Sequence, residues 1–311
     1  MTESTARHPL LGSALGLLAV ALFGATLPVT RWALAGHGDA DGQAAGLTPM
    51  FITFARAVGA AAVSCVFLVW TKAPRPQGRE WLLLALASVG NAVLYPLSLA
   101  VALQTQSAAH VAVITALLPL CTAAVAAWWS HTSPGGRGHL RFWICALLST
   151  GVVAWFSVWR GGQGFHPIAE DLLLVVGVLS ASVGYVFGVR VAQRMGPEAT
   201  ICWLTVVALP VSVPLTIEYW PAQPVGAQGW AGVAWLSLVS MWAAFFAWYR
   251  ALDWGGPLRV SQLQSLQPFF SIAIAWPLVG EAPEPATLAF ALAVVALVAT
   301  GTWRPRASPS P

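Results

Sequence analysis

Ten long apolar stretches, separated by short polar segments, divide this chain along its whole length. Each is close to the roughly 20 residues that an α-helix needs to cross about 30 Å of hydrocarbon. The stretches are continuously apolar instead of alternating, which argues against a membrane β-barrel. With 58% hydrophobic and 8% charged residues, the 311-residue chain carries more apolar surface than one soluble core can enclose. The sequence therefore predicts an all-α membrane protein with ten transmembrane helices, at about 10–35, 50–70, 81–103, 108–129, 140–159, 170–194, 199–217, 228–251, 257–279 and 284–303.

Lysine and arginine are concentrated in every second gap between these stretches. Twelve of the fifteen lie near the termini or in alternate gaps, whereas the intervening gaps hold most of the acidic residues. By the positive-inside rule, the basic gaps face the cytoplasm. We therefore predict a multi-pass protein of the bacterial inner (plasma) membrane with both termini cytoplasmic. The twelve basic residues are Arg7, Lys72, Arg75, Arg79, Arg137, Arg141, Arg190, Arg194, Arg250, Arg259, Arg304 and Arg306.

A short pattern occurs twice, at equivalent places in two sets of five predicted helices. Ala102-Leu103 is followed sixteen residues later by Pro119, and 149 positions further on Ala251-Leu252 is followed by Pro268 in the same way. A unit of five helices that is inserted twice must have opposite orientations, because five is odd. The sequence therefore predicts two inverted five-helix repeats, at 10–160 and 170–303, with a site near the membrane midplane.

At these residues the chain resembles the ten-helix EamA-type branch of the drug/metabolite transporter superfamily. The second half matches the family pattern of Ala-Leu, a proline in the next helix and a later Gly-Glu, here Gly280-Glu281. The first half matches the Ala-Leu and the proline, but the Gly-Glu position reads Trp129-Ser130-His131. Phe23-Gly24 and Arg56 are similar to further family positions.

The resemblance implies a secondary transporter that works by alternating access, moves a small metabolite, an amino acid or an amphiphilic compound, and exports it. The motifs belong to the scaffold and do not identify the solute. A membrane scaffold or sensor that transports nothing is the alternative. The expected partners are a small-molecule substrate and the lipid bilayer, and a homodimer is left open.

Catalytic and cofactor-dependent functions have little support in the residues. The six histidines are scattered without zinc-binding spacing, and the four cysteines lie singly within apolar stretches. We therefore expect no enzyme activity, no metal and no cofactor. The net charge of +4 is explained by the loop charges of a membrane protein, so no nucleic acid is expected as a partner.

Neutral polar side chains within the predicted helices are the best candidates for binding a solute, because they can line a cavity without the penalty of a buried charge. Gln264 and Gln267 are three residues apart and share one face of a helix. Hydrogen bonding between helices is the alternative role for all of these residues. The substrate-binding candidates are Asn91, Tyr95, Thr115, Tyr185, Trp242, Tyr249, Gln264 and Gln267.

Three ionisable residues and two prolines are candidates for charge or gating roles. Arg56 lies within a predicted helix, where it could bind a carboxylate or extend its side chain to the headgroups. Every Asp and Glu lies at a helix end or in a loop, so only His110 and Glu281 are candidates for coupling transport to protons. Pro119 and Pro268 each remove a backbone donor within a helix and could act as hinges.

The predicted topology can be tested with reporter fusions at each terminus and with impermeant labelling of single cysteines in the gaps. Fusions at both ends should report the cytoplasm, and cysteines introduced at Asp39 and Glu218 should be labelled from outside the cell. Termini on opposite faces of the membrane would contradict both the number of ten helices and the inverted repeat.

Overall fold

The computed structural model describes residues 9–35, 46–130, 137–160, 169–255 and 260–302, and these residues form helices with no strand among them. Every predicted apolar stretch coincides with helical elements over its described residues, and positions 257–259 and 303 lie outside them. In chain order they are α1 (Pro9–Gly24), α2 (Thr26–Ala35), α3 (Pro49–Trp70), α4 (Glu80–Ser88), η1 (Val89–Leu94), α5 (Tyr95–Thr105), α6 (Ala108–Thr115), α7 (Leu118–Ser130), α8 (Arg137–Arg160), α9 (Ala169–Met195), α10 (Pro197–Glu218), α11 (Ala227–Trp235), η2 (Leu236–Ala243), α12 (Ala244–Gly255), η3 (Ser261–Leu266), α14 (Gln267–Val279) and α15 (Pro285–Thr302).

Seven helical segments of the described chain are long and apolar enough to cross a membrane. Three shorter apolar helices, at 143–153, 263–279 and 285–300, accompany them. Many large apolar side chains on these helices are exposed, among them Trp70, Leu147 and Leu172. Such a surface is suited to lipid, because lipid removes the penalty of leaving apolar groups unburied. The count of ten spans stays a prediction.

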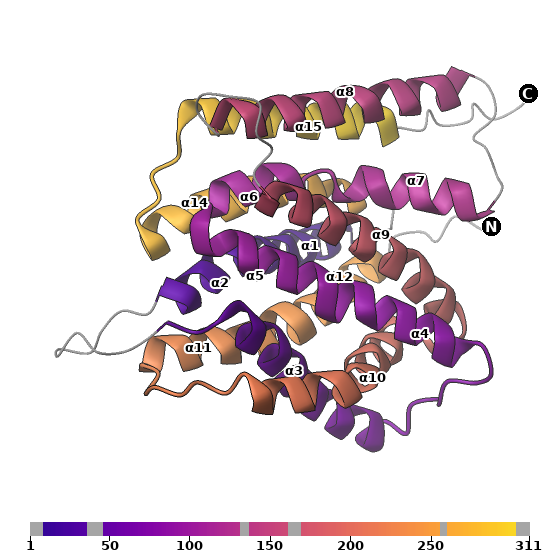
Figure 1. Ribbon diagram of the computed structural model, residues 1–311. Coiled ribbons are helices and arrows are strands. Elements are labelled where there is room, and N and C mark those ends of the chain that lie inside the picture. The colour runs from indigo at the N-terminus through magenta and orange to yellow at the C-terminus, as the bar shows by residue number, and fades with distance from the viewer. Residues whose placement is uncertain (1–8, 36–45, 131–136, 161–168, 256–259, 303–311) are drawn as a thin grey trace, which may run out of the picture.

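The helices pack so that the early part of the chain contacts the late part. In Figure 1, α8 and α15 lie side by side at the top, and the two helices contact each other directly. In the same way α3 packs on α10, α1 on α12, and α9 on the segment formed by α4, η1 and α5. The most enclosed element is α6, whose residues are all buried in the largest apolar cluster.

Glycines allow two of these helix pairs to approach closely. A Cβ added to Gly12 of α1 would lie 2.2 Å from the backbone nitrogen of Gly255 at the end of α12. A Cβ at Gly90 of η1 would lie 2.3 Å from the carbonyl oxygen of Ser180 on α9. Small residues at such positions let helix backbones pack together in membranes.

Five helical segments are interrupted, the first of them at Ala25 between α1 and α2. The segments 80–105 and 227–255 each contain a π-helical part, η1 and η2, and π-helical turns are frequent at functional sites. The segment that begins with α6 is broken at Ala116 and Leu117 before α7 starts at Leu118. The 3₁₀ helix η3 precedes α14, which starts at Gln267. These interruptions were not predicted from the sequence.

The close contact at Gly12 predicts the effect of adding one methyl group. Gly12→Ala should lower the free energy of unfolding by about 1–3 kcal/mol, because the methyl group meets a backbone that cannot rotate away. Gly188→Ala on α9 is the matched control, since no atom lies within 4 Å of its added Cβ. That control should change stability by no more than about 1 kcal/mol, in the stabilising direction. Unfolding in mixed micelles would measure both, and equal effects would contradict the close packing of α1 on α12.

Candidate functional site

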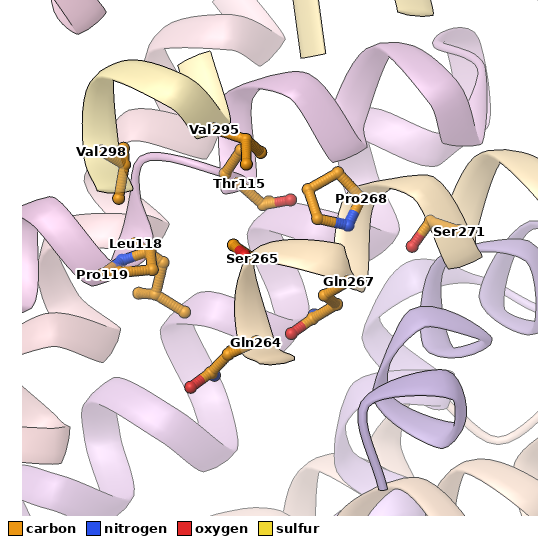
Figure 2. Close-up of a pocket in the computed structure, with 11 residues that line it drawn as sticks. Thr115, Leu118, Pro119, Gln264, Ser265, Gln267, Pro268, Ser271, Val295 and Val298 are labelled. Atoms are coloured by element: carbon orange, nitrogen blue, oxygen red, sulfur yellow. The ribbon is translucent and has the colours of Figure 1, made fainter. Parts of the chain in front are cut away.

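A pocket lies where the break between α6 and α7 meets the 3₁₀ helix η3 and the start of α14. It has an empty volume of ≈ 450 Å³, part of it open to solvent, and all of its lining side chains are neutral. Figure 2 shows Ser265 beside Thr115, and the side chains of Gln264 and Gln267 extending toward the lower left of the view. The remaining lining residues are Ala116, Leu118, Pro119, Pro268, Ser271, Val295 and Val298. Three of the predicted substrate-binding residues, Thr115, Gln264 and Gln267, therefore lie in one pocket.

Pro119 and Pro268 are the second residues of α7 and α14, where proline is well tolerated because the first amides of a helix have no partner within it. The sequence placed them inside continuous helices, and the structure instead places each directly after a break. Proline has no N–H to donate to the carbonyl four residues earlier, which belongs to Thr115 for Pro119 and to Gln264 for Pro268. Both of these residues line the pocket.

The side-chain amides of Gln264 and Gln267 make no hydrogen bond to any described residue, and both side chains retain accessible surface. Each amide has two N–H donors and an oxygen that can accept two hydrogen bonds, so the two amides together offer up to eight hydrogen-bonding positions. By contrast, Ser271 donates to the carbonyl oxygen of Gly24 at 2.7 Å and is 1% exposed. Ser271 therefore joins α14 to α1, and the two glutamines are free to bind.

The other predicted binding residues surround a second group of polar atoms. Asn91 is in η1, Tyr95 begins α5, Tyr185 is in α9 and Tyr249 is in α12. The hydroxyl groups of Tyr95, Tyr185 and Tyr249 form no hydrogen bond to the described residues. The Asn91 Oδ1 atom is buried without a partner. Trp242 of η2 stacks on Phe246 with ring centroids 4.3 Å apart, and its Nε1 atom is also buried without a partner.

Arg56 of α3 is only 7% exposed, so its head group does not extend out to the surface of the bundle. It forms no ion pair with a described residue, and its Nε atom has no hydrogen-bond partner. Tyr95 and Tyr185 are close enough to interact with the charge of the Arg56 guanidinium. An arginine enclosed by protein without an acidic partner is unusual, because buried charges are normally paired.

Glu281 takes part in an ion pair that joins distant parts of the chain. Gly280 ends α14 with a left-handed φ of 72°, a conformation that glycine adopts without strain, and this turns the chain toward Arg31. The Glu281 carboxylate pairs with Arg31 and accepts a hydrogen bond of 2.8 Å from the backbone N–H of Ala108, at the start of α6. Arg31 also donates to the carbonyl oxygen of Gln106.

His110 is fully buried and bound to an acid that the sequence analysis did not select. The His110 Nε2 and Asp171 Oδ1 atoms are 2.8 Å apart, and Asp171 is 4% exposed. The imidazole also packs on the ring of Phe156, with centroids 4.9 Å apart. Asp171 is the third residue of α9, and acidic residues are common in the first turn of any helix, so the sequence held no signal of burial.

The predicted site residues therefore separate into three groups. Thr115, Gln264 and Gln267 line the pocket with the two prolines, Tyr95 and Tyr185 lie near Arg56, and His110 and Glu281 bind Asp171 and Arg31. Among the described residues, no group of three or more His, Cys, Asp or Glu side chains is placed to hold a metal ion.

Long apolar helices around a neutral polar pocket define a multi-pass membrane protein of the transporter class. The EamA-like transporter family model matches residues 10–158 and 168–300, and the chain belongs to this family, within the drug/metabolite transporter superfamily. An uncharacterized transporter of Bacillus subtilis (strain 168), YdeK, is 32% identical over 286 residues, which cover 91% of this chain and 94% of that protein. A crystal structure with 18% identity superimposes with a TM-score of 0.58 over 94% of this chain and 96% of the other, which supports the fold alone.

The His110–Asp171 contact can be measured with a double-mutant cycle. Asp171→Leu should lower the free energy of unfolding by about 3 kcal/mol, because it leaves the buried imidazole without a partner. The combined His110→Leu/Asp171→Leu variant should lose less than the sum of the two single variants, by about 1–3 kcal/mol. Glu170→Leu, at the adjacent and more exposed acid, should change stability by about 0.5 kcal/mol or less. Strictly additive single effects would contradict the pair.

Proposed function

We propose that the protein is a secondary transporter of the bacterial inner membrane, with cytoplasmic termini, that exports a small solute by alternating access. Two inverted five-helix repeats, 10–160 and 170–303, rock around a binding site that both contribute. The observation that carries the proposal is the pocket at which two interrupted helices meet. Non-helical backbone at membrane depth is tolerated where it lines a cavity, and transporters bind their substrates at such interruptions.

The positions of the interruptions support the repeat. The elements α7 and α14 start at Leu118 and Gln267, which are 149 positions apart, and each has proline as its second residue. The π-helical parts, η1 and η2, also follow one another at nearly this spacing. The helix contacts are also equivalent between the two proposed repeats. The first helix of the second repeat, α9, packs on α5 and α7, and the first helix of the first repeat, α1, packs on α12 and α14. The family match to two separate halves agrees with this division.

Two ion pairs support alternating closure at the two ends of the bundle. Arg31 pairs with Glu281, and Arg194 pairs with Glu80, so that each pair joins one proposed repeat to the other. Arg31 also contacts Gln106, which directly follows the segment 80–105, whereas Glu80 begins it. A helical segment of 26 residues spans about 39 Å. The two pairs therefore lie at opposite ends of this segment, where either can open while the other holds.

The Arg31–Glu281 pair is the better enclosed of the two. The exposed fractions of its side chains are 29% and 14%, and that of Arg194 is 42%. In the predicted topology the Arg31–Glu281 pair closes the end of the helix bundle that faces the outside of the cell. Glu281 also accepts a hydrogen bond from the first amide of α6, so the pair is linked to α6 as well as to α14, and both elements line the pocket.

Metabolite profiling of cells that lack or overproduce the protein, followed by flux measurements in proteoliposomes, tests the function. The solute whose level changes should cross liposomes that contain the purified protein. Replacing both pocket amides, by Gln264→Ala together with Gln267→Ala, should lower this flux about tenfold or more, because one or two hydrogen bonds to the solute are lost.

The matched control is Gln77→Ala, which removes the same amide from an exposed loop. This control should transport at the rate of the unmodified protein. If no solute changes in cells and none crosses proteoliposomes, the protein is a scaffold or sensor and the proposal is wrong.

A further inference from the structure

Two polar side chains on α3 point into the bundle without any partner in the described chain. Arg56 is 7% exposed, and Thr53, three residues earlier on the same helix face, is 0% exposed. The Thr53 Oγ1 and Arg56 Nε atoms are both buried and have no hydrogen-bond partner. A buried hydroxyl normally bonds to a carbonyl or to another side chain, and a buried guanidinium normally meets a carboxylate.

The surroundings of Arg56 offer further donors and no acid. Tyr95 and Tyr185 are partly buried and close enough to the guanidinium to interact with its charge, and their hydroxyls bond to no described residue. Asn91, on the neighbouring η1, has a buried oxygen without a partner. The described acids that are buried, Asp171 and Glu281, are bound to His110 and Arg31 instead.

We propose that Arg56 binds a carboxylate group of the transported solute, with the hydroxyls of Thr53, Tyr95 and Tyr185 as accompanying donors. The planar guanidinium matches a carboxylate with two parallel N–H···O bonds, and hydroxyl donors satisfy its remaining lone pairs. The solute thus supplies the negative charge that the chain does not. This inference rests on the proposed transport function and states the class of its substrate.

A monoanion fits this site better than a dianion. Arg56 is one cation, and the nearby groups that accompany it are neutral, so that a phosphate with two negative charges would keep one charge uncompensated in a water-poor interior. An uncharged solute would leave the guanidinium unpaired, as it is without a ligand. A carboxylate therefore gains most from binding at this position.

Thermal unfolding of the purified full-length protein in nanodiscs tests the proposal. The probes are aliphatic and aromatic carboxylates, with and without an α-ammonium group, each paired with the carboxamide of the same skeleton. At least one carboxylate should raise the melting temperature by roughly 2–4 °C, and its carboxamide should not. Arg56→Gln should weaken the binding of that carboxylate by about tenfold to a hundredfold.

The control variant is Arg250→Gln, which removes an exposed guanidinium from α12 and should leave carboxylate binding unchanged. A further variant, Arg56→Met, keeps the length and volume of the side chain without its charge. It should melt at or above the temperature of the unmodified protein without ligand, because the uncompensated charge is gone. A melting temperature several degrees lower would show that Arg56 supports the fold, and would overturn the proposal.

Two other results would overturn it. One is that no carboxylate of the set stabilises the protein, and the other is that carboxamides stabilise it equally. Neither result bears on whether solutes are transported. If flux in proteoliposomes is found for a neutral or cationic solute, the transport function stands and the assignment of Arg56 fails.

Discussion

The lack of water in the hydrocarbon region is the constraint on which the rest of this structure depends. Each backbone N–H and C=O at that depth must find its partner within the protein, so unbroken helices are the default. The interruptions at Ala116, at Leu266 and in the two π-helical parts are departures from that default. Two of them meet at the neutral pocket, where enclosed polar groups can accept a solute in place of water. Two of the sites of irregular backbone thus coincide with the proposed binding pocket.

The same lack of water in the hydrocarbon region also decides where charged side chains lie. The ion pairs Arg31–Glu281 and Arg194–Glu80 lie at helix ends, and the buried His110 is hydrogen-bonded to Asp171. Partners at the ends of the bundle can separate into water or headgroups at little cost, because surface ion pairs contribute about 1 kcal/mol or less. The contacts at Gly12 and Gly90 bring backbones together and hold firmly.

Arg56 is the exception to this distribution, and its environment differs from that of the pocket. The pocket glutamines can bond to many polar solutes, which gives little selectivity by charge. An unpaired guanidinium selects for an anion, because leaving it unpaired is unfavourable and pairing it with a solute is reversible. The pocket amides and Arg56 would then contribute differently to recognition, the first through hydrogen bonds and the second through charge.

The sequence alone determined the all-helical membrane class and the helical stretches, because a helix that crosses hydrocarbon needs a long, continuous apolar run. Its motif residues also indicated the family. The sequence also selected Thr115, Gln264 and Gln267, because polar residues within such runs are rare. Only the tertiary structure decided which of them share a pocket, that His110 is bound to Asp171, and that Glu281 is bound to Arg31. These pairings join residues 61 to 250 positions apart. Helix periodicity places a side chain on a face, but which helix lies opposite that face depends on how the whole bundle packs.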